Sequence, residues 1–198
     1  MSAPIQNRDD LFIEEKINGK IYLMARPFFN HMRVQGNIRS IFEEYFRKTG
    51  RDCEAIFEAQ LDIRNEYNDY VVPDIMVLCY NQQDDDDKIP LIVVEVLSKS
   101  TRNKDLSEKM ELYAKLGIKE YWIADLKNLS VDIYILNNEN NYKLYKSYVY
   151  YEEEDFPKNK HQKEEEEKKL IKEFSPVLFP ELIIKLEDVF YRVISNKN

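Results

Sequence analysis

An apolar run at residues 91–97, with the sequence LIVVEVL, constrains the fold of this chain more than any other feature. Hydrophobic side chains at successive positions point to both faces of an extended segment, which is typical of a strand buried on both sides. The run therefore predicts an interior strand of a sheet. Its single charged residue, Glu95, would then lie inside the protein, where an ionised carboxylate requires a partner.

Strand patterns and helix patterns alternate along the rest of the chain. Strands are indicated by alternating apolar residues or short apolar runs, and helices by apolar residues spaced three and four apart. The predicted elements are two strands within 12–24 around an Asn-Gly turn, a helix over 31–49, strands over 55–63 and within 70–80, a helix over 102–116, strands over 121–124, 131–136 and 142–150, and a short helix over 186–194. This order predicts an α/β fold with a central mixed β-sheet flanked by helices.

The length of 198 residues is that of one domain. One segment, residues 152–172, departs from the rest because it is of low complexity and dense in charge. Such a segment forms either a solvated helix or a flexible insertion. We interpret it as a charged, flexible insertion within a single domain that spans residues 1–198.

Composition excludes several classes of protein. Hydrophobic residues make up 43% of the chain, enough for a packed core. No run of 18 apolar residues predicts a membrane span, and residues 1–10 are too polar for a secretory signal. Four glycines are too few for a phosphate-binding glycine loop, and Cys53 and Cys79 fit neither a disulfide scaffold nor a zinc site. We expect a soluble, cytoplasmic protein with reduced thiols and no membrane association.

The net charge of −8 comes from two acidic patches. Residues 84–87 and 151–167 together carry −9, so the remainder carries +1. Two other segments, 26–51 and 98–119, contain more basic than acidic residues. The acidic total therefore does not exclude a nucleic-acid partner, although these basic segments also fit ordinary solvated helix faces.

Two carboxylates stand out against their apolar surroundings. An ionised Glu95 in a buried strand would cost several kcal/mol unless it met a metal cation, a basic side chain or a proton. Asp74 follows Pro73, and proline interrupts strand pairing, so a strand bends or begins there. Each residue alone also fits a structural role, a salt bridge for Glu95 and a turn for Asp74. Together, on neighbouring strands, they would suit Mg²⁺, which prefers carboxylate oxygens.

The helix predicted over 102–116 adds a basic residue. Asp105 and Lys109 are four positions apart and share one face, which in the plain interpretation makes them a surface ion pair. In the functional interpretation, the Lys109 ammonium leans towards Glu95. The hydroxyl-rich turn at 98–101 is expected to cap this helix with Ser100 or Thr101. Because His31 and His161 are the only histidines and neither has a nucleophile-like setting, a serine hydrolase is disfavoured.

These residues lie in four runs whose combination is specific. The runs are VPDI at 72–75, EVLSKST at 95–101, DLSEK at 105–109 followed by Tyr113 and Gly117, and EYWI at 120–123. In this order and spacing they resemble the PD-(D/E)XK nuclease superfamily and, within it, the Uma-type family of putative restriction endonucleases. His31 matches the histidine that opens the first helix of that family. The resemblance covers residues 10–150 and 174–192.

The resemblance implies a restriction-endonuclease-like core and a metal-dependent endonuclease that hydrolyses phosphodiester bonds in DNA. Asp74, Glu95 and the main-chain carbonyl of Val96 would hold Mg²⁺ or Mn²⁺, and Lys109 would assist the water or the transition state. His31 and Asp105 are possible accessory residues. The family also implies a homodimer.

Two departures from the family pattern leave a second function open. The superfamily lysine two residues after the glutamate is Leu97 here, and the family is expected to take it from the following helix, as Lys109. Lys99 replaces the usual proline of the turn and is expected to be solvated or to make a backbone contact. The alternative to a nuclease is a catalytically silent nucleic-acid-binding or interaction module that retains the nuclease fold.

Overall fold

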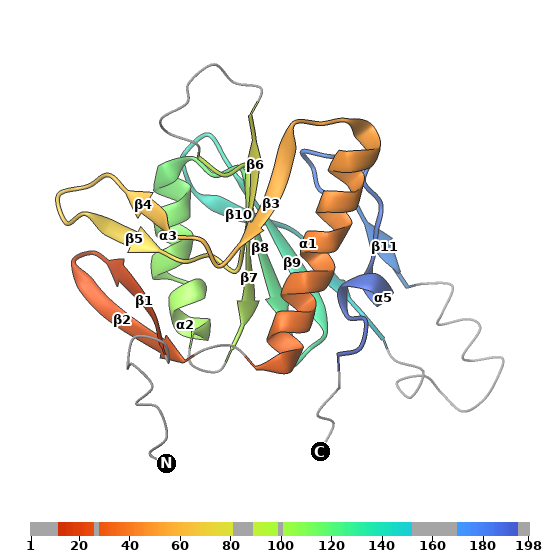
Figure 1. Cartoon of the computed structure of the whole chain (residues 1–198), viewed down its shortest axis with the longest axis horizontal. Helices are drawn as coiled ribbons and strands as arrows, with labels where there is room; N and C mark the ends of the chain where they lie inside the picture. Colours follow the sequence, from red (N-terminus) through yellow and green to blue (C-terminus); the bar gives the residue numbers. More distant parts are fainter. Residues whose placement is uncertain (1–11, 26–27, 81–88, 99–100, 152–169, 194–198) are drawn as a thin grey trace, which may run out of the picture.

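The computed structural model describes residues 12–25, 28–80, 89–98, 101–151 and 170–193. Figure 1 shows the elements of these ranges. They are β1 (Phe12–Ile17), β2 (Lys20–Ala25), α1 (Phe29–Thr49), β3 (Cys53–Phe57), β4 (Leu61–Ile63), β5 (Asp69–Val71), β6 (Ile75–Cys79), β7 (Ile92–Leu97), α2 (Arg102–Asp105), α3 (Glu108–Leu116), β8 (Glu120–Asp125), β9 (Ser130–Leu136), β10 (Tyr142–Val149), β11 (Glu173–Phe174), β12 (Ile184–Lys185) and α5 (Leu186–Val189). Among these elements, no helix is both long enough and apolar enough to span a membrane.

A six-stranded sheet in the order β10-β9-β8-β7-β6-β3 forms the centre of the fold. Strands β7 and β8 pair in parallel, and the remaining neighbours in this sheet pair antiparallel. The parallel pair requires a crossover, which α2 and α3 provide. The predicted α/β fold with a central mixed sheet is therefore confirmed.

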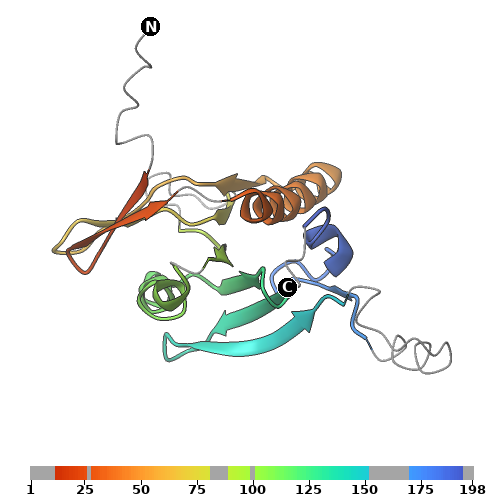
Figure 2. The ribbon, with the colours of Figure 1, turned by 90° about the horizontal axis from the view of Figure 1, so that it is seen from below.

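Both faces of this sheet are covered, as the apolar run in β7 predicts. Alternate residues of β7 point in opposite directions, so Val94 and Val96 pack with α1 and α5. Val93 and Leu97 pack on the other face, with α3 and the N-terminal hairpin. Figure 2 shows α1 and α5 on one side of the sheet and α3 on the other. The Glu95 side chain lies on the face of the sheet that α3 covers, where it contacts Lys109 and Tyr113.

Two predicted strands are each divided between two sheets. The strand expected over 55–63 is broken at Glu58, whose φ of +49° ends β3 before β4 begins. The apolar segment 70–80 is broken at Pro73 into β5 and β6. In both cases one part joins the large sheet and the other joins a four-stranded sheet in the order β2-β1-β5-β4. The prediction of one continuous strand over 55–63 is wrong, because alternation does not show where a chain changes sheets.

Three other predicted elements differ in extent or position. The helix expected over 102–116 is divided at Ser107, whose backbone is not helical, so Leu106 is partly exposed and not on the inner face. The C-terminal helix ends at Val189 and not at residue 194. The predicted insertion at 152–172 falls largely outside the described residues, since residues 152–169 are not among them.

The two cysteines form a disulfide, which contradicts the expectation of reduced thiols. Cys53 and Cys79 are directly opposite each other in the antiparallel pair of β3 and β6, with Cα atoms 4.0 Å apart. The sequence hides this proximity because the residues are 26 positions apart. The prediction fails because it counted cysteines without knowing the strand register.

Asp69 anchors the hairpin of β1 and β2 to the rest of the small sheet. Its carboxylate accepts hydrogen bonds from the backbone N–H groups of Asn18 (2.7 Å) and Gly19 (2.9 Å) and from the Asn65 amide (2.9 Å). Burial opposes ionisation of this carboxyl, but the hydrogen bonds outweigh burial and lower its pKa. The Asn-Gly turn predicted from the sequence is thus fixed by a carboxylate from a distant segment.

This arrangement predicts that Asp69→Asn destabilises the fold at neutral pH by about 1–2 kcal/mol, since a charged acceptor is replaced by a neutral one. A carboxyl with a lowered pKa in the folded state contributes stability above its unfolded pKa of about 3.9, and the contribution is lost as the pH falls through the folded pKa. Urea unfolding at neutral pH and near pH 3 should show the difference between wild type and variant shrinking in acid. Asp62→Asn, at an exposed position on β4, is the matched control. An equal loss at both pH values would contradict the assignment.

Candidate active site

Asp74 directly precedes β6, and Glu95 lies within β7, each one residue beyond the part where these two strands pair. Ile75 is opposite Val94 in the antiparallel register, so one step further places Asp74 opposite Glu95. The backbone N–H of Val96 donates a hydrogen bond to Oδ2 of Asp74 over 2.6 Å. The structure therefore brings together the two carboxylates that the sequence singled out.

Helix α1 supplies two side chains to Asp74. Gln35 donates to Oδ1 over 3.0 Å, and Nε2 of His31 lies 3.2 Å from Oδ2. These residues are four positions apart and occupy one helix face. Burial opposes the charged form of His31, but the hydrogen bond and charge of Asp74 outweigh it and raise the pKa of the imidazole. The structure places His31 at the site, and it adds Gln35, which the sequence did not indicate.

Lys109 on α3 reaches Glu95. Its Nζ lies 2.8 Å from Oε1 of Glu95, and the hydroxyl of Tyr113, one turn further along, donates to the same oxygen over 2.7 Å. Lys109 is 1% exposed and Glu95 is 2% exposed. The interpretation of Lys109 as half of a surface ion pair is wrong, because the helix turns this ammonium into the interior.

A third carboxylate, Glu15 on β1, completes the surroundings of Lys109. Oε1 of Glu15 lies 2.8 Å from Nζ of Lys109, and Lys104 on α2 forms an ion pair with Oε2. Neither Glu15 nor Lys104 was singled out from the sequence. Glu15 stands between the charged residues Glu14 and Lys16 and has the pattern of a solvated strand. Its role in the site becomes visible only in the structure, where the hairpin of β1 and β2 brings Glu15 to Lys104 of α2 and Lys109 of α3.

Asp105 also belongs to this buried cluster. Its Oδ1 lies 3.7 Å from Nζ of Lys109, and this oxygen has no hydrogen-bond partner within the described ranges. Its backbone carbonyl accepts a hydrogen bond from the Tyr121 hydroxyl over 2.8 Å. The shared face of Asp105 and Lys109 is as predicted, but it is an interior face. Segment 98–119 therefore offers less basic surface than its composition implies.

The cluster combines three carboxyl groups with two ammonium groups, all nearly inaccessible to solvent: Glu15, Glu95, Asp105, Lys104 and Lys109. Burial raises the pKa of Glu95 and of Asp105, against the lowering effect of Lys109. Burial opposes the charge of Lys109, but the neighbouring carboxylates outweigh it and raise its pKa, so the lysine is an ammonium. With Lys109 charged, a proton on one carboxyl group balances the cluster.

The donors around Asp74 and Glu95 fit a hard divalent cation. Two carboxylates and the main-chain carbonyl of Val96 are oxygen ligands, and Mg²⁺ is commonly held by one or two carboxylates with water in the remaining positions. Nδ1 of His31 is buried beside them without a hydrogen-bond partner among the described residues. The described ranges contain no group of three or more His, Cys, Asp or Glu side chains arranged as a complete metal site. Water and substrate oxygens would therefore supply part of the coordination.

Thr101, one of the two residues expected to cap the helix over 102–116, occupies the N-cap position of α2, but its side chain makes no capping hydrogen bond. The Ser98 hydroxyl accepts a hydrogen bond from the Thr101 backbone N–H over 3.2 Å, and the two hydroxyl oxygens are 2.9 Å apart. Lys99 and Ser100 lie outside the described residues. Leu97, which occupies the usual lysine position, is buried in the core.

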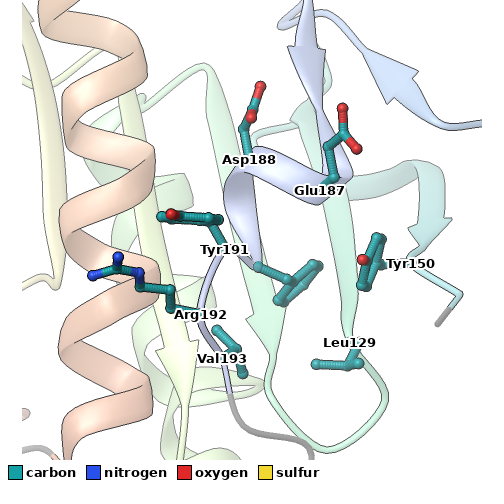
Figure 3. A pocket seen from close by; sticks show the side chains of 8 residues that line it. Leu129, Tyr150, Glu187, Asp188, Tyr191, Arg192 and Val193 are labelled. Carbon is teal, nitrogen blue, oxygen red and sulfur yellow. The ribbon is translucent and has the colours of Figure 1, made fainter.

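A pocket of about 440 Å³ lies apart from these residues. Figure 3 shows it between α5 and the turn that joins β8 to β9, with Glu187 and Asp188 on one side and Arg192 on the other. None of its lining residues belongs to the carboxylate cluster. The candidate active site is thus defined by its buried charges and not by this cavity.

Comparisons with known proteins agree with the geometry. Residues 3–160 match the Uma2 family, described as "putative restriction endonuclease". A protein of Synechocystis sp. PCC 6803, described as uncharacterized protein slr1290, is 29% identical over 133 residues, which cover 65% of this chain and 68% of that protein. A crystal structure from Anabaena variabilis, described as a putative nuclease belonging to DUF820, superposes with a TM-score of 0.63 at 18% identity and 91% coverage of each chain. This chain belongs to the Uma2 family of putative restriction endonucleases, as the four sequence runs predicted.

Proposed function

We propose that this chain is a metal-dependent endonuclease that hydrolyses phosphodiester bonds in DNA. One observation carries the proposal: Asp74 lies opposite Glu95, one step beyond the paired residues of β6 and β7, and a buried ammonium lies 2.8 Å from Glu95. The family implies a nucleic-acid substrate, and restriction-endonuclease-like proteins generally use divalent metals. Asp74, Glu95 and the Val96 carbonyl would hold Mg²⁺ or Mn²⁺.

Each residue has a task that its contacts support. The bound metal would lower the pKa of a water molecule and offset negative charge on the phosphodiester. Lys109 would orient the water or stabilise the charge that develops in the transition state, which a preorganised ammonium does well in a dry site. His31 would hold Asp74 in place through its 3.2 Å contact. Asp105 would help to keep the Lys109 ammonium near Glu95.

A metal site of this kind predicts stabilisation by divalent cations. A ligand that binds only the folded state raises stability by about 2.7 kcal/mol at a hundredfold excess over its dissociation constant. The melting temperature should therefore rise with Mn²⁺ concentration in wild type and stay constant in Asp74→Asn. Asp62→Asn should respond as wild type does. No response of wild type at millimolar Mn²⁺ would contradict a metal-dependent enzyme.

The activity test is cleavage of labelled duplex, single-stranded and branched nucleic acids in Mg²⁺ and in Mn²⁺. Wild type is compared with Asp74→Asn and Asp62→Asn, all purified identically. Cleavage by wild type and Asp62→Asn alone would support the nuclease and identify its substrate. Equal cleavage by all three would indicate a contaminant. Binding without cleavage, at any metal concentration, would favour the catalytically silent module.

We also propose a cytoplasmic homodimer. Phe28 and Phe29, at the start of α1, are 84% and 79% exposed, the highest values among the large hydrophobic residues described. A second copy that buried them would remove this apolar surface from water. The cytoplasm would give access to DNA, whereas the disulfide between Cys53 and Cys79 is more typical of oxidising compartments. Sedimentation of the intact protein and thiol titration of protein from the native cell would test both statements.

A further inference from the structure

Lys109 is held by carboxylates from two different sheets. Glu95 belongs to the large sheet, and Glu15 belongs to the hairpin of the small sheet. Nζ of Lys109 lies 2.8 Å from Oε1 of each. An ammonium has three N–H donors, so these two contacts fix its position between the carboxylates.

Glu15 is also bonded to the segment that leads to Asp74. Its Oε1 accepts a hydrogen bond from the backbone N–H of Val72 over 2.9 Å, two residues before Asp74. Its Oε2 pairs with Lys104, whose ammonium lies 5.3 Å from the centre of the Tyr22 ring. One carboxylate thus connects the lysine of α3 with the segment between β5 and β6.

Stability alone does not account for this arrangement. Each buried charge carries a desolvation penalty of several kcal/mol, and well-packed apolar side chains of similar volume are often as stabilising as a buried ion pair. Glu15 is completely buried, and it adds a third carboxyl group to a cluster that already contains Glu95 and Asp105. In the proposed function Glu95 binds a metal ion. A second acceptor, Glu15, would then keep the Lys109 ammonium in place while Glu95 does so.

We propose that Glu15 is a positioning residue that holds the Lys109 ammonium beside Glu95 during the reaction. The inference rests on the proposed nuclease function, in which Lys109 acts at the substrate. Lys104 balances the charge of Glu15. The N-terminal hairpin is therefore part of the active site, although none of its residues touches the substrate in this assignment.

The kinetic test compares Glu15→Gln with Glu120→Gln, a buried glutamate outside the cluster, and with Glu14→Gln, a control at the neighbouring exposed position. Outer-shell partners of catalytic groups typically contribute about 10–100-fold. We expect kcat of Glu15→Gln to fall by this amount with KM unchanged. Glu120→Gln should keep its kcat, and Glu14→Gln should match wild type. Equal losses of kcat in Glu15→Gln and Glu120→Gln would overturn the proposal, because the loss of any buried carboxylate would then account for them.

If Glu15→Gln does not fold, the double variant Glu15→Gln/Lys104→Met replaces it. This variant removes one negative and one positive charge from the interior, so the charge balance of the cluster is kept. The same decrease in kcat is expected. Wild-type kcat in the folded double variant would overturn the proposal.

A second measurement is independent of activity. In metal-free protein with isotope-labelled lysine, NMR should detect the Lys109 ammonium protons in wild type, because a buried, hydrogen-bonded ammonium exchanges them slowly. The signal should weaken or disappear in Glu15→Gln and persist in Glu14→Gln. An unchanged Lys109 signal in Glu15→Gln would contradict positioning. If wild type cleaves no substrate but the signal behaves as expected, the proposed function fails and the contact assignment stands.

Discussion

Replacing Glu95 by glutamine should reduce cleavage by at least about a thousandfold and leave the protein folded. A divalent metal contributes several kcal/mol to transition-state stabilisation, and each 1.4 kcal/mol corresponds to about tenfold in rate. The amide of glutamine keeps an oxygen for the hydrogen bonds from Lys109 and Tyr113, but it is a much weaker metal ligand. The measurement is cleavage of the preferred labelled substrate in Mn²⁺.

Folding should survive this change because the remaining charges balance. Without the Glu95 carboxyl, the cluster retains two acids, Glu15 and Asp105, and two ammonium groups. Burial already raises the pKa of Glu95, so the folded protein gains little from its negative charge. The melting temperature in chelator should therefore stay close to that of wild type, while its response to Mn²⁺ should disappear.

Glu120→Gln is the matched control for a buried glutamate. Glu120 is the first residue of β8 and lies outside the buried charge cluster. Its carboxylate accepts hydrogen bonds from the Trp122 indole (2.9 Å) and the Leu178 backbone N–H (2.6 Å). This variant should cleave as wild type does. A Glu95→Gln protein that cleaved as wild type does, and whose melting temperature still rose with Mn²⁺, would contradict the assignment of Glu95 as a metal ligand. A wild type that neither cleaved nor responded to Mn²⁺ would support a metal-free structural ion pair between Glu95 and Lys109.

The sequence predicted those residues of the candidate site that differ clearly in character from their neighbours in the sequence. Glu95 is conspicuous because six apolar residues surround it in the 91–97 run, and Asp74 because a proline precedes it. Lys109 shares a helical face with Asp105 at a spacing of four. These signals are local, so they are readable from one sequence. His31 gained its place only from the resemblance to the family.

The missing part of the site depends on contacts between distant segments. Glu15 lies among charged neighbours on its own strand, and its burial results from the packing of the hairpin against α2 and α3. Gln35 has no feature that distinguishes it from other polar residues of α1. The same reason applies to the disulfide, which requires the register of β3 and β6. Pairing between strands is set by packing that local patterns do not encode.

Lys109→Met should have the largest effect on stability. Removing the cation leaves three buried carboxyl groups with the single ammonium of Lys104, and breaking a buried ion pair in this way typically costs about 3–5 kcal/mol. For a chain of this length, each kcal/mol lowers the melting temperature by roughly 2–4 °C, so a decrease on the order of 10 °C is expected. Thermal unfolding in chelator measures it. Lys115→Met, at an exposed position on the same helix, should show almost no change.

The stability that Lys109→Met loses relative to wild type should become smaller as the pH falls. Without Lys109, burial favours protonated carboxyl groups in the folded state more strongly than in wild type, so the folded variant binds more protons than the unfolded chain. The free energy of unfolding of the variant then rises as the pH falls, and its deficit against wild type narrows. A deficit that is constant between about pH 8 and pH 5, the range over which raised carboxyl pKa values would act, would contradict the assignment of uncompensated carboxylates.

A double variant separates the two roles of Lys109. Glu15→Gln/Lys109→Met removes one of the uncompensated carboxylates, so it should be more stable than Lys109→Met alone. It does not restore an ammonium beside Glu95, so its cleavage rate should remain as low as that of Lys109→Met. Recovery of both stability and cleavage would mean that Lys109 serves only to neutralise Glu15. Recovery of stability alone would identify the ammonium itself as the group that acts on the reaction.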